Sequence, residues 1–192
     1  MPTERRISRI KRVLERRQRD LTVVCENIHD PHNVSAILRT CDSVGNDAIH
    51  LLYSTEAFPR LGKKSSASAK KWLDFHRHRN YEKLRDVLKS ENKTIYATYL
   101  DAGSISIYDI DWTEPAAIIM GNEHRGVSDE ALEISDRHIY IPMFGMVESL
   151  NVSVATAVIL YEACRQRITA KQYLQSNHPD WIREKLDEWL NS

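Results

Sequence analysis

The chain has 192 residues, 42% of them hydrophobic, which is enough for one globular domain with a substantial core. No hydrophobic run approaches the roughly 20 residues that span a membrane, and the arginine-rich start lacks the hydrophobic stretch of a secretory signal. Cys25, Cys41 and Cys164 are widely spaced, without a CxxC pair. This spacing favours reduced thiols in a cytoplasmic protein over a disulfide framework or a zinc site. Cys25 and Cys164 lie in apolar segments and are predicted to be small buried hydrophobic residues.

The formal net charge of zero conceals two basic segments. Residues 1–20 contain eight Lys or Arg against three acids (+5), and residues 60–79 contain seven against one (+6), so the rest of the chain sums to −11. Two basic segments on an otherwise acidic chain are typical of a protein that binds a polyanion, and we predict nucleic acid. The alternative, a solvated helix face and a soluble loop, would explain either segment alone.

Hydrophobic residues at helical spacing predict an N-terminal helix over residues 3–19. Its apolar face carries Ile7, Ile10, Val13 and Leu14. Such a face docks on a partner, or the helix stays mobile, unless the chain provides a core for it. Pro31 and Gly45 mark the start and the end of a second predicted helix, over about residues 32–43.

Short hydrophobic strands alternate with these helices and with further ones. The predicted strands are 21–25, 48–53, 72–75, 94–100, 116–120 and 139–141. The further helices are predicted over 81–88, 129–134, about 150–168 and 180–190, and loops over 56–71 and 101–115. Strands that alternate with helices imply an α/β fold, with a parallel sheet and right-handed crossovers.

Three polar clusters follow predicted strands, at residues 27–39, 121–126 and 149–151. Ligands of open α/β sheets bind at the carboxyl ends of the strands, so this placement indicates a functional site. Taken singly, each cluster has an ordinary explanation: helix capping for the first and third, and a strand-to-helix turn for the second. Asn33 and Arg39 are six residues apart, so helical spacing does not require them to pair.

The third cluster opens a helix that consists almost wholly of Val, Ala, Ile and Leu. Ser149 is the expected N-cap of this helix, because its hydroxyl can accept from backbone N–H groups of the first turn. The helix is too apolar for a surface helix, so its start is predicted to lie against a core or a partner subunit. The loop before it, with unpaired backbone donors, is suited to hold a ligand.

Several other kinds of site find no support in the sequence. There is no GxGxxG and no GxxxxGK, so neither a dinucleotide site nor a P-loop is indicated. The histidine pairs His29 with His32 and His76 with His78 lack a third ligand at metal spacing, and no metal site is predicted. The order of residues indicates no Ser-His-Asp or Cys-His arrangement.

Together, the three clusters resemble the motifs of the SpoU/TrmH family of RNA 2′-O-ribose methyltransferases, in the family's order. The matching segments are Asn33 to Arg39, Ile119–Ser128 and Ile141–Ala155. The resemblance covers about residues 20–168, and three motifs at suitable separations are far more specific than one. It implies a SPOUT fold, a parallel sheet with a deep trefoil knot in its C-terminal part, which works as a homodimer. Pattern analysis alone predicts no knot, because true knots are rare exceptions.

The terminal segments also resemble those of family members that act on guanosine 18 in the tRNA D-loop. We therefore expect a basic N-terminal helical extension over residues 1–20, a SPOUT methyltransferase domain over 21–168 and a C-terminal helical extension over 169–192. The implied reaction moves a methyl group from S-adenosylmethionine to the 2′-hydroxyl of that guanosine. The alternatives are another tRNA or rRNA nucleotide, a non-catalytic RNA-binding SPOUT dimer, and a small-molecule α/β enzyme.

The resemblance also implies roles for single residues. The implied catalytic residues are Arg39, Asn33, Glu123, Ser149 and Asn151. The implied cofactor-binding residues, which would act largely through backbone groups, are Thr98, Leu100, Gly121, Asn122, Gly126, Ile141, Met143 and Leu150. The residues expected to bind tRNA lie in the two basic segments. They are Arg5, Arg6, Arg9, Arg12, Lys63, Lys64, Lys70 and Lys71. Arg125 and Glu148 are assigned no role.

Overall fold

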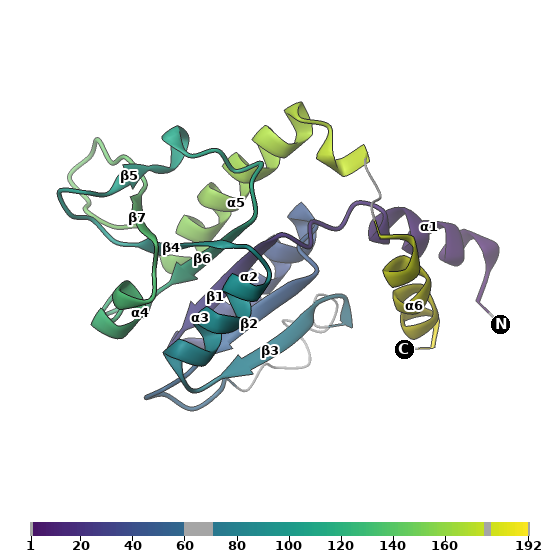
Figure 1. The fold of residues 1–192 in the computed structure, drawn as a ribbon, viewed down its shortest axis with the longest axis horizontal. Coiled ribbons are helices and arrows are strands. Elements are labelled where there is room, and N and C mark those ends of the chain that lie inside the picture. Colours follow the sequence, from purple (N-terminus) through teal and green to yellow (C-terminus); the bar gives the residue numbers. More distant parts are fainter. Residues whose placement is uncertain (1, 60–70, 175–177, 192) are drawn as a thin grey trace.

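The computed structural model describes residues 2–59, 71–174 and 178–191. A parallel seven-stranded sheet forms its centre, with the strand order β3-β2-β1-β6-β4-β7-β5 (Figure 1). The strands are β1 (Leu21–Glu26), β2 (Ala48–Leu52), β3 (Asp74–His78), β4 (Thr94–Thr98), β5 (Ile105–Ser106), β6 (Ala116–Met120) and β7 (Arg137–Tyr140). The helices are α1 (Glu4–Leu14), α2 (Pro31–Val44), α3 (Tyr81–Ser90), α4 (Asp129–Glu133), α5 (Val152–Thr169) and α6 (Pro179–Leu190), with short 3-10 helices at Ile107–Asp109 and Gln172–Leu174.

Helices cover both faces of the sheet, which explains why its central strands are hydrophobic throughout. All residues of β1 and β6 are buried. Side chains alternate between the faces: Val23 and Ile118 belong to the core under α2 and α5, whereas Val24 and Ile119 belong to the core under α3 and α4. Continuous hydrophobic strands are typical of parallel sheets with two covered faces. The predicted α/β class and parallel sheet are therefore confirmed, while the trefoil knot stays a prediction.

Several element boundaries differ from the predicted ones by one or two residues, and three differences are larger. The strand predicted over 72–75 lies at Asp74–His78, because it pairs with the whole of β2. The loop predicted over 101–115 contains β5, which pairs with β7. The first helix ends at Leu14 instead of residue 19, and Arg17 then turns inward to pair with Asp42 at 2.6 Å.

The predicted ends of α2 are confirmed. Pro31 occupies the first turn, and the Asp30 side chain accepts from the backbone N–H of His32 at 2.8 Å. Gly45 ends the helix with a φ of +88°. A Cβ atom there would lie 2.8 Å from the backbone oxygen of Arg16, so glycine suits both the conformation and the space.

The two terminal helices pack against each other beside the sheet (Figure 1). Their shared core contains Ile10 and Leu14 of α1 and Ile182 and Trp189 of α6. The apolar face predicted on α1 therefore finds a core within the chain, supplied by a segment some 170 residues away. This packing leaves the arginine-rich side of α1 in solvent.

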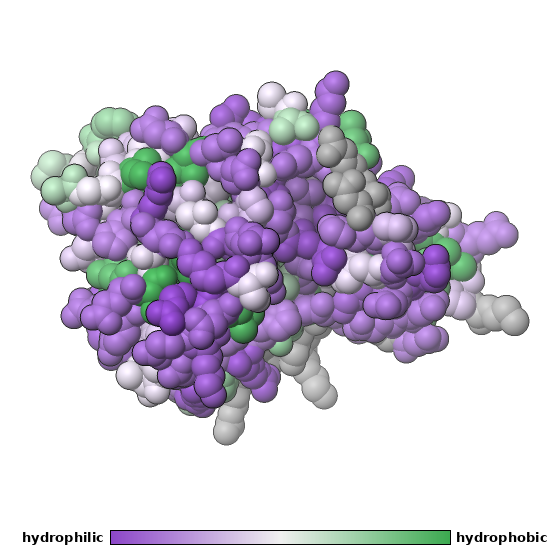
Figure 2. Space-filling view, viewed as in Figure 1, coloured by the Kyte–Doolittle hydropathy of each residue, from purple (hydrophilic) through white to green (hydrophobic). Residues whose placement is uncertain are grey.

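The face of the molecule in Figure 2 is mainly hydrophilic, and its hydrophobic side chains form small, separate groups. In the part of the chain that the structure describes, no helix is both long enough and apolar enough to cross a membrane. Cys25 and Cys41 are buried, as small hydrophobic residues are, whereas Cys164 is only half-buried.

His50 lies buried in β2 beside two histidines of β3. Its Nδ1 atom is 3.0 Å from Nε2 of His78, and its ring stacks on His76 with the centroids 4.9 Å apart. Burial, reinforced by the charges of His76, His78 and Lys93, lowers the pKa of His50 to about 2. His50 is therefore neutral in the folded protein across the physiological range.

We expect the free energy of unfolding to fall as the pH drops below about 6.5. The unfolded chain then protonates this histidine while the folded chain does not, at a cost of up to about 1.4 kcal/mol per pH unit. In His50→Gln, the contribution of this one proton to the slope of unfolding free energy against pH should disappear. Urea unfolding of both proteins at pH 7, 6 and 5 measures it, with the exposed His29→Gln as control. Parallel curves for wild type and His50→Gln would contradict the assignment.

Candidate active site

A carboxylate at the carboxyl edge of the sheet joins two of the three polar clusters. One oxygen of Glu123 accepts from the backbone N–H of His29 at 2.9 Å. The other accepts from the backbone N–H of Asp30 at 3.1 Å and from Nδ2 of Asn33 at 2.9 Å. Partial burial acts to raise the pKa of Glu123, but these hydrogen bonds outweigh it and lower the pKa below its ordinary value. Glu123 is therefore ionised at neutral pH and accepts only.

The third cluster extends this chain of hydrogen bonds. Nδ2 of Asn151 donates to Oδ1 of Asn33 at 3.1 Å, so Asn151, Asn33 and Glu123 form one continuous polar network. Oδ1 of Asn151 accepts from the backbone N–H of Ser153 at 2.9 Å and caps α5. The predicted cap, Ser149, is wrong: the helix begins only at Val152, and Ser149 is an exposed residue two positions before the cap.

Arg39 lies on α2, six residues after Asn33 and therefore roughly 9 Å further along the helix axis. It is exposed, and it forms no hydrogen bond or ion pair with any residue that the structure describes. The two residues do not pair, in line with their helical spacing. The guanidinium group is free to bind a ligand, and no contact within the chain depends on it.

Gly121 and Gly126 shape the loop that presents Glu123. A Cβ atom at Gly121 would lie 2.3 Å from the backbone of Gly126 and of Val127, a distance that no real side chain tolerates. Gly126 has a φ of +71°, a conformation that favours glycine. Glycine at both positions therefore allows the two ends of the loop to approach each other closely.

Asn122 holds the same loop from inside and is only 8% exposed. Its Oδ1 accepts from the backbone N–H groups of His124 at 2.9 Å and Arg125 at 3.2 Å. Its Nδ2 donates to the backbone oxygen of Asn27 at 2.7 Å. The backbone N–H and oxygen of Asn122 are both paired with Gly126 at 2.9 Å, so side chain and backbone together organise the loop.

Asn27 holds two loops of the site together, a role that the sequence patterns did not indicate. It has a φ of +46°, directly after β1, and its side chain binds the loop after β2: Oδ1 accepts from the N–H of Thr55 at 3.2 Å and Nδ2 donates to Ser54 at 3.2 Å. Asparagine is enriched at positive φ among the non-glycine residues, and its place as the first residue of the first cluster, directly after a buried strand, was the available signal.

The segments predicted to bind the cofactor meet because β6, β4 and β7 are neighbours in the sheet. Thr98 donates to the backbone oxygen of Ile119 at 3.0 Å, and Leu100 is 71% exposed. In the loop between β7 and α5, the side chains of Ile141, Met143 and Leu150 are half-buried. The backbone N–H groups of residues 143–150 donate to no residue that the structure describes. Apolar side chains beside unpaired backbone donors fit an adenine ring with its polar edges.

The predicted RNA-binding arginines of α1 lie on a different part of the molecule. Arg5, Arg6, Arg9 and Arg12 are exposed on α1, and three of them, with Ser8, line a shallow cavity of about 580 Å³. Lys71 is exposed as well. Lys63, Lys64 and Lys70 lie outside the described residues.

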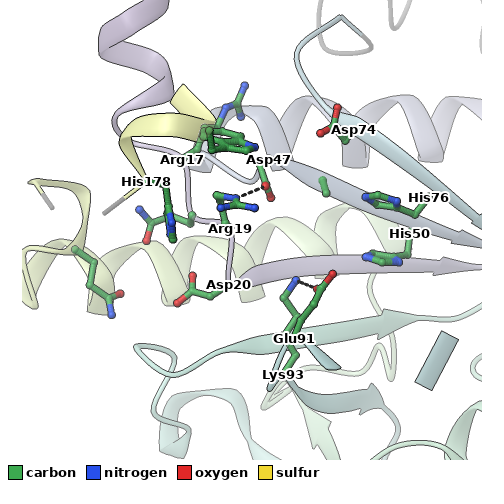
Figure 3. A pocket seen from close by; sticks show the side chains of 14 residues that line it. Arg17, Arg19, Asp20, Asp47, His50, Asp74, His76, Glu91, Lys93 and His178 are labelled. Carbon is green, nitrogen blue, oxygen red and sulfur yellow. Dashed lines mark hydrogen bonds and ion pairs between the residues drawn. The ribbon is translucent and has the colours of Figure 1, made fainter. Parts of the chain in front are cut away.

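A second cavity, of about 530 Å³, lies at the opposite, amino edge of the sheet, between the strand starts and α6 (Figure 3). None of the predicted catalytic or cofactor-binding residues lines it. Two of its cations are paired within it, Arg19 with Asp47 at 3.5 Å and Lys93 with Glu91 at 2.5 Å. Among the described residues, no group of His, Cys, Asp or Glu is arranged to hold a metal ion.

Comparisons with known proteins point to one family. The SpoU rRNA Methylase family matches residues 20–161. A tRNA (guanosine(18)-2'-O)-methyltransferase of Thermus thermophilus is 46% identical over 189 residues, which are 98% of this chain and 97% of that protein. The crystal structure of the A. aeolicus TrmH/SpoU tRNA modifying enzyme has a TM-score of 0.89 at 38% identity, covering 97% of this chain and 95% of that one. The SpoU methyltransferase AviRb from Streptomyces viridochromogenes, solved with AdoMet, has a TM-score of 0.70 at 27% identity, covering 79% of this chain and 60% of that one.

Proposed function

Because this chain belongs to the SpoU rRNA Methylase family, we propose that it transfers a methyl group from S-adenosylmethionine to the 2′-hydroxyl of guanosine 18 in tRNA. The observation that carries the chemistry is the network Asn151–Asn33–Glu123, which joins all three motifs at the start of the helix that carries the unpaired Arg39. The nucleotide assignment is supported by the 46% identical relative, whose match extends over both terminal helices.

The bound cofactor would supply an activated methyl group, so the protein has mainly to align the ribose hydroxyl with it. We assign the binding of S-adenosylmethionine, within a methyltransferase domain over 21–168, largely to backbone groups of Thr98, Leu100, Gly121, Asn122, Gly126, Ile141, Met143 and Leu150. This assignment is supported by the free backbone donors of 143–150 and by the AdoMet complex of the Streptomyces relative. In this proposal segment 1–20 is a basic N-terminal helical extension that binds RNA, and segment 169–192 is a C-terminal helical extension.

Arg39 is the catalytic residue of the proposal. As a charged guanidinium it would hold an RNA phosphate and stabilise the alkoxide that develops as the 2′-hydroxyl passes its proton to solvent water. Asn33, Glu123 and Asn151 form the network at the start of the same helix, and the exposed hydroxyl of Ser149 would contact the ribose or the methionine moiety. The three free thiols support a cytoplasmic site of action.

The deciding experiment is methyl transfer from labelled S-adenosylmethionine to unmodified tRNA transcripts, with the modified nucleoside mapped by mass spectrometry. We expect 2′-O-methylguanosine at D-loop position 18. Methylation of another tRNA or rRNA nucleotide would retain the chemistry and overturn the target. Absence of both incorporation and cofactor binding would favour a non-catalytic RNA-binding role.

The proposed enzyme is a homodimer, which is supported by an exposed apolar stripe on α5. Val154, Tyr161 and Ile168 follow one another at intervals of seven residues, so they share one face of the helix, and all three are about half exposed or more. The neighbouring loop adds Phe144 and Met146, both 98% exposed. Apolar groupings of this kind mark interaction sites. Sedimentation velocity checks the state, and a monomer at micromolar concentration would contradict it.

We expect the arginine face of α1 to bind tRNA through its phosphates. Replacing Arg5, Arg9 and Arg12 by alanine should weaken tRNA binding at least about tenfold at 0.1 M salt and lower the slope of log affinity against log salt by about three. The fold should survive, because the buried face of α1 is untouched. Filter binding at several salt concentrations measures both quantities.

The matched control replaces three exposed cations of another helix, Lys83, Arg85 and Lys89 of α3. It changes the net charge by the same amount. If both triple variants lose affinity equally, the effect belongs to the net charge and not to a specific face.

A further inference from the structure

The loop after β2 holds a carboxylate in a rigid position at the rim of the candidate site. The backbone N–H of Glu56 donates to Oδ1 of Asn27 at 3.3 Å. Its backbone oxygen accepts from Nη1 of Arg79 at 3.0 Å. The same Asn27 accepts at its own backbone oxygen from Asn122. Glu56 is therefore tied to the loop that carries Glu123.

Two exposed side chains converge on this carboxylate. Nη2 of Arg125 lies 3.0 Å from one oxygen of Glu56, and Nδ1 of His29 lies 3.8 Å from the other. The Arg125 and His29 side chains are 61% and 69% exposed. Both belong to the candidate site through their backbones: the N–H of His29 donates to Glu123, and Arg125 follows Glu123 by two residues in the same loop.

Stability does not explain this arrangement. An exposed ion pair contributes only about 0–1 kcal/mol, and less in salt. A negative charge at the rim also opposes the approach of a polyanion. The guanidinium group of Arg125 and the imidazole N–H of His29, however, are both good phosphate ligands. They lie on two sides of a single anionic group, so that one phosphate could contact both.

We propose that Arg125 and His29 bind a backbone phosphate of the RNA next to the target nucleotide, and that Glu56 occupies the place of that phosphate in the free enzyme. The proposal rests on the proposed function, because it assumes an RNA substrate at this site. In the complex the phosphate displaces Glu56 from Arg125, which positions the strand relative to Glu123 and Arg39. Arg125 and Glu56 thus act on RNA binding and not on the methyl donor.

The test measures the Kd of tRNA in the presence of S-adenosylhomocysteine, which allows binding without reaction. Arg125→Ala should raise the Kd about tenfold, which corresponds to about 1.4 kcal/mol, and should lower the salt slope by about one. Glu56→Gln should act in the opposite direction and lower the Kd about twofold to fivefold, because the competing negative charge is gone. The Kd of S-adenosylmethionine should stay unchanged in both variants.

Arg85→Ala is the matched control, because it also removes an exposed arginine that lies 3.0 Å from a carboxylate, that of Asp86. The proposal is overturned if Arg125→Ala binds tRNA like Arg85→Ala, or if Glu56→Gln weakens binding. Methylation by the wild type, mapped in parallel, separates a failure of the phosphate contact from a failure of the proposed function. If the wild type methylates tRNA and Arg125→Ala binds normally, only the phosphate contact fails; if the wild type binds and methylates no RNA, the proposed function fails and the phosphate contact with it.

Discussion

Replacement of Arg39 by alanine should lower the rate of methyl transfer by about 10²- to 10³-fold, while the affinity for S-adenosylmethionine and the melting temperature stay unchanged. The retained fold follows from the structure, because Arg39 is exposed and forms no hydrogen bond or ion pair with a described residue. Single-turnover rates with saturating enzyme measure the chemical step, and calorimetric titration measures cofactor binding. Near-normal turnover in Arg39→Ala would exclude its catalytic role.

Arg39→Lys separates two mechanisms for this residue. A neutral arginine base would require a pKa of about 12.5–13.8 to be brought to neutrality, at a cost of roughly 8–9 kcal/mol. A charged arginine that holds a phosphate and stabilises an alkoxide requires much less of an exposed site. If charge is what matters, lysine should restore part of the lost rate. Single-turnover rates of Arg39→Lys beside Arg39→Ala measure this recovery.

The sequence predicted the parts of the fold that depend on local pattern. The strand Ala116–Met120 was predicted to the residue, and Pro31 and Gly45 bounded α2 as expected, because hydrophobic runs and backbone-restricted residues act within a few positions. The three polar clusters were located for the same reason, and the resemblance to a known family supplied their meaning.

Contacts between residues that are far apart in the chain could not be predicted from the sequence. Glu123 binds residues 90 to 94 positions earlier in the chain, and α1 finds its core in α6. Periodicity states which face of a helix is buried but not against which partner. The side-chain pairings of Asn27 and Glu56 depend on loop conformations, which no pattern of hydrophobic residues describes. These pairings form only in the folded structure, where the strand order brings the loops to one edge of the sheet.

Replacement of Glu123 by glutamine should lower the rate of methyl transfer by about 10²-fold, although the side chain keeps its shape. Both oxygens of Glu123 accept from N–H groups, those of His29, Asp30 and Asn33. Whichever way a glutamine amide is turned, its NH₂ end faces at least one of these donors. A donor left without its partner at a partly buried site costs about 1–3 kcal/mol, and 10²-fold corresponds to about 2.7 kcal/mol.

The network cannot relax by turning its amides over. Nδ2 of Asn33 is held by Glu123, and Oδ1 of Asn151 must accept from the backbone N–H of Ser153 at the start of α5. Backbone donors thus set the direction of the hydrogen bonds at both ends. An inverted Asn33 would place two NH₂ groups against each other at Asn151. Glu123→Gln should therefore displace Asn33 and the first turn of α2, and with it Arg39.

Rapid-quench rates for Glu123→Gln, beside Glu130→Gln as an exposed control in the following helix, measure the effect. The pH profile gives a second readout. The hydrogen bonds hold the pKa of Glu123 below its ordinary value of 4.5, so the carboxylate and the stability it contributes persist on lowering the pH from 8 to 5 and are lost only as the pH falls through that lowered pKa. Wild-type activity should show no titration of Glu123 in that range. An equal rate in the two glutamine variants would mean that the network holds the loops together without positioning Arg39.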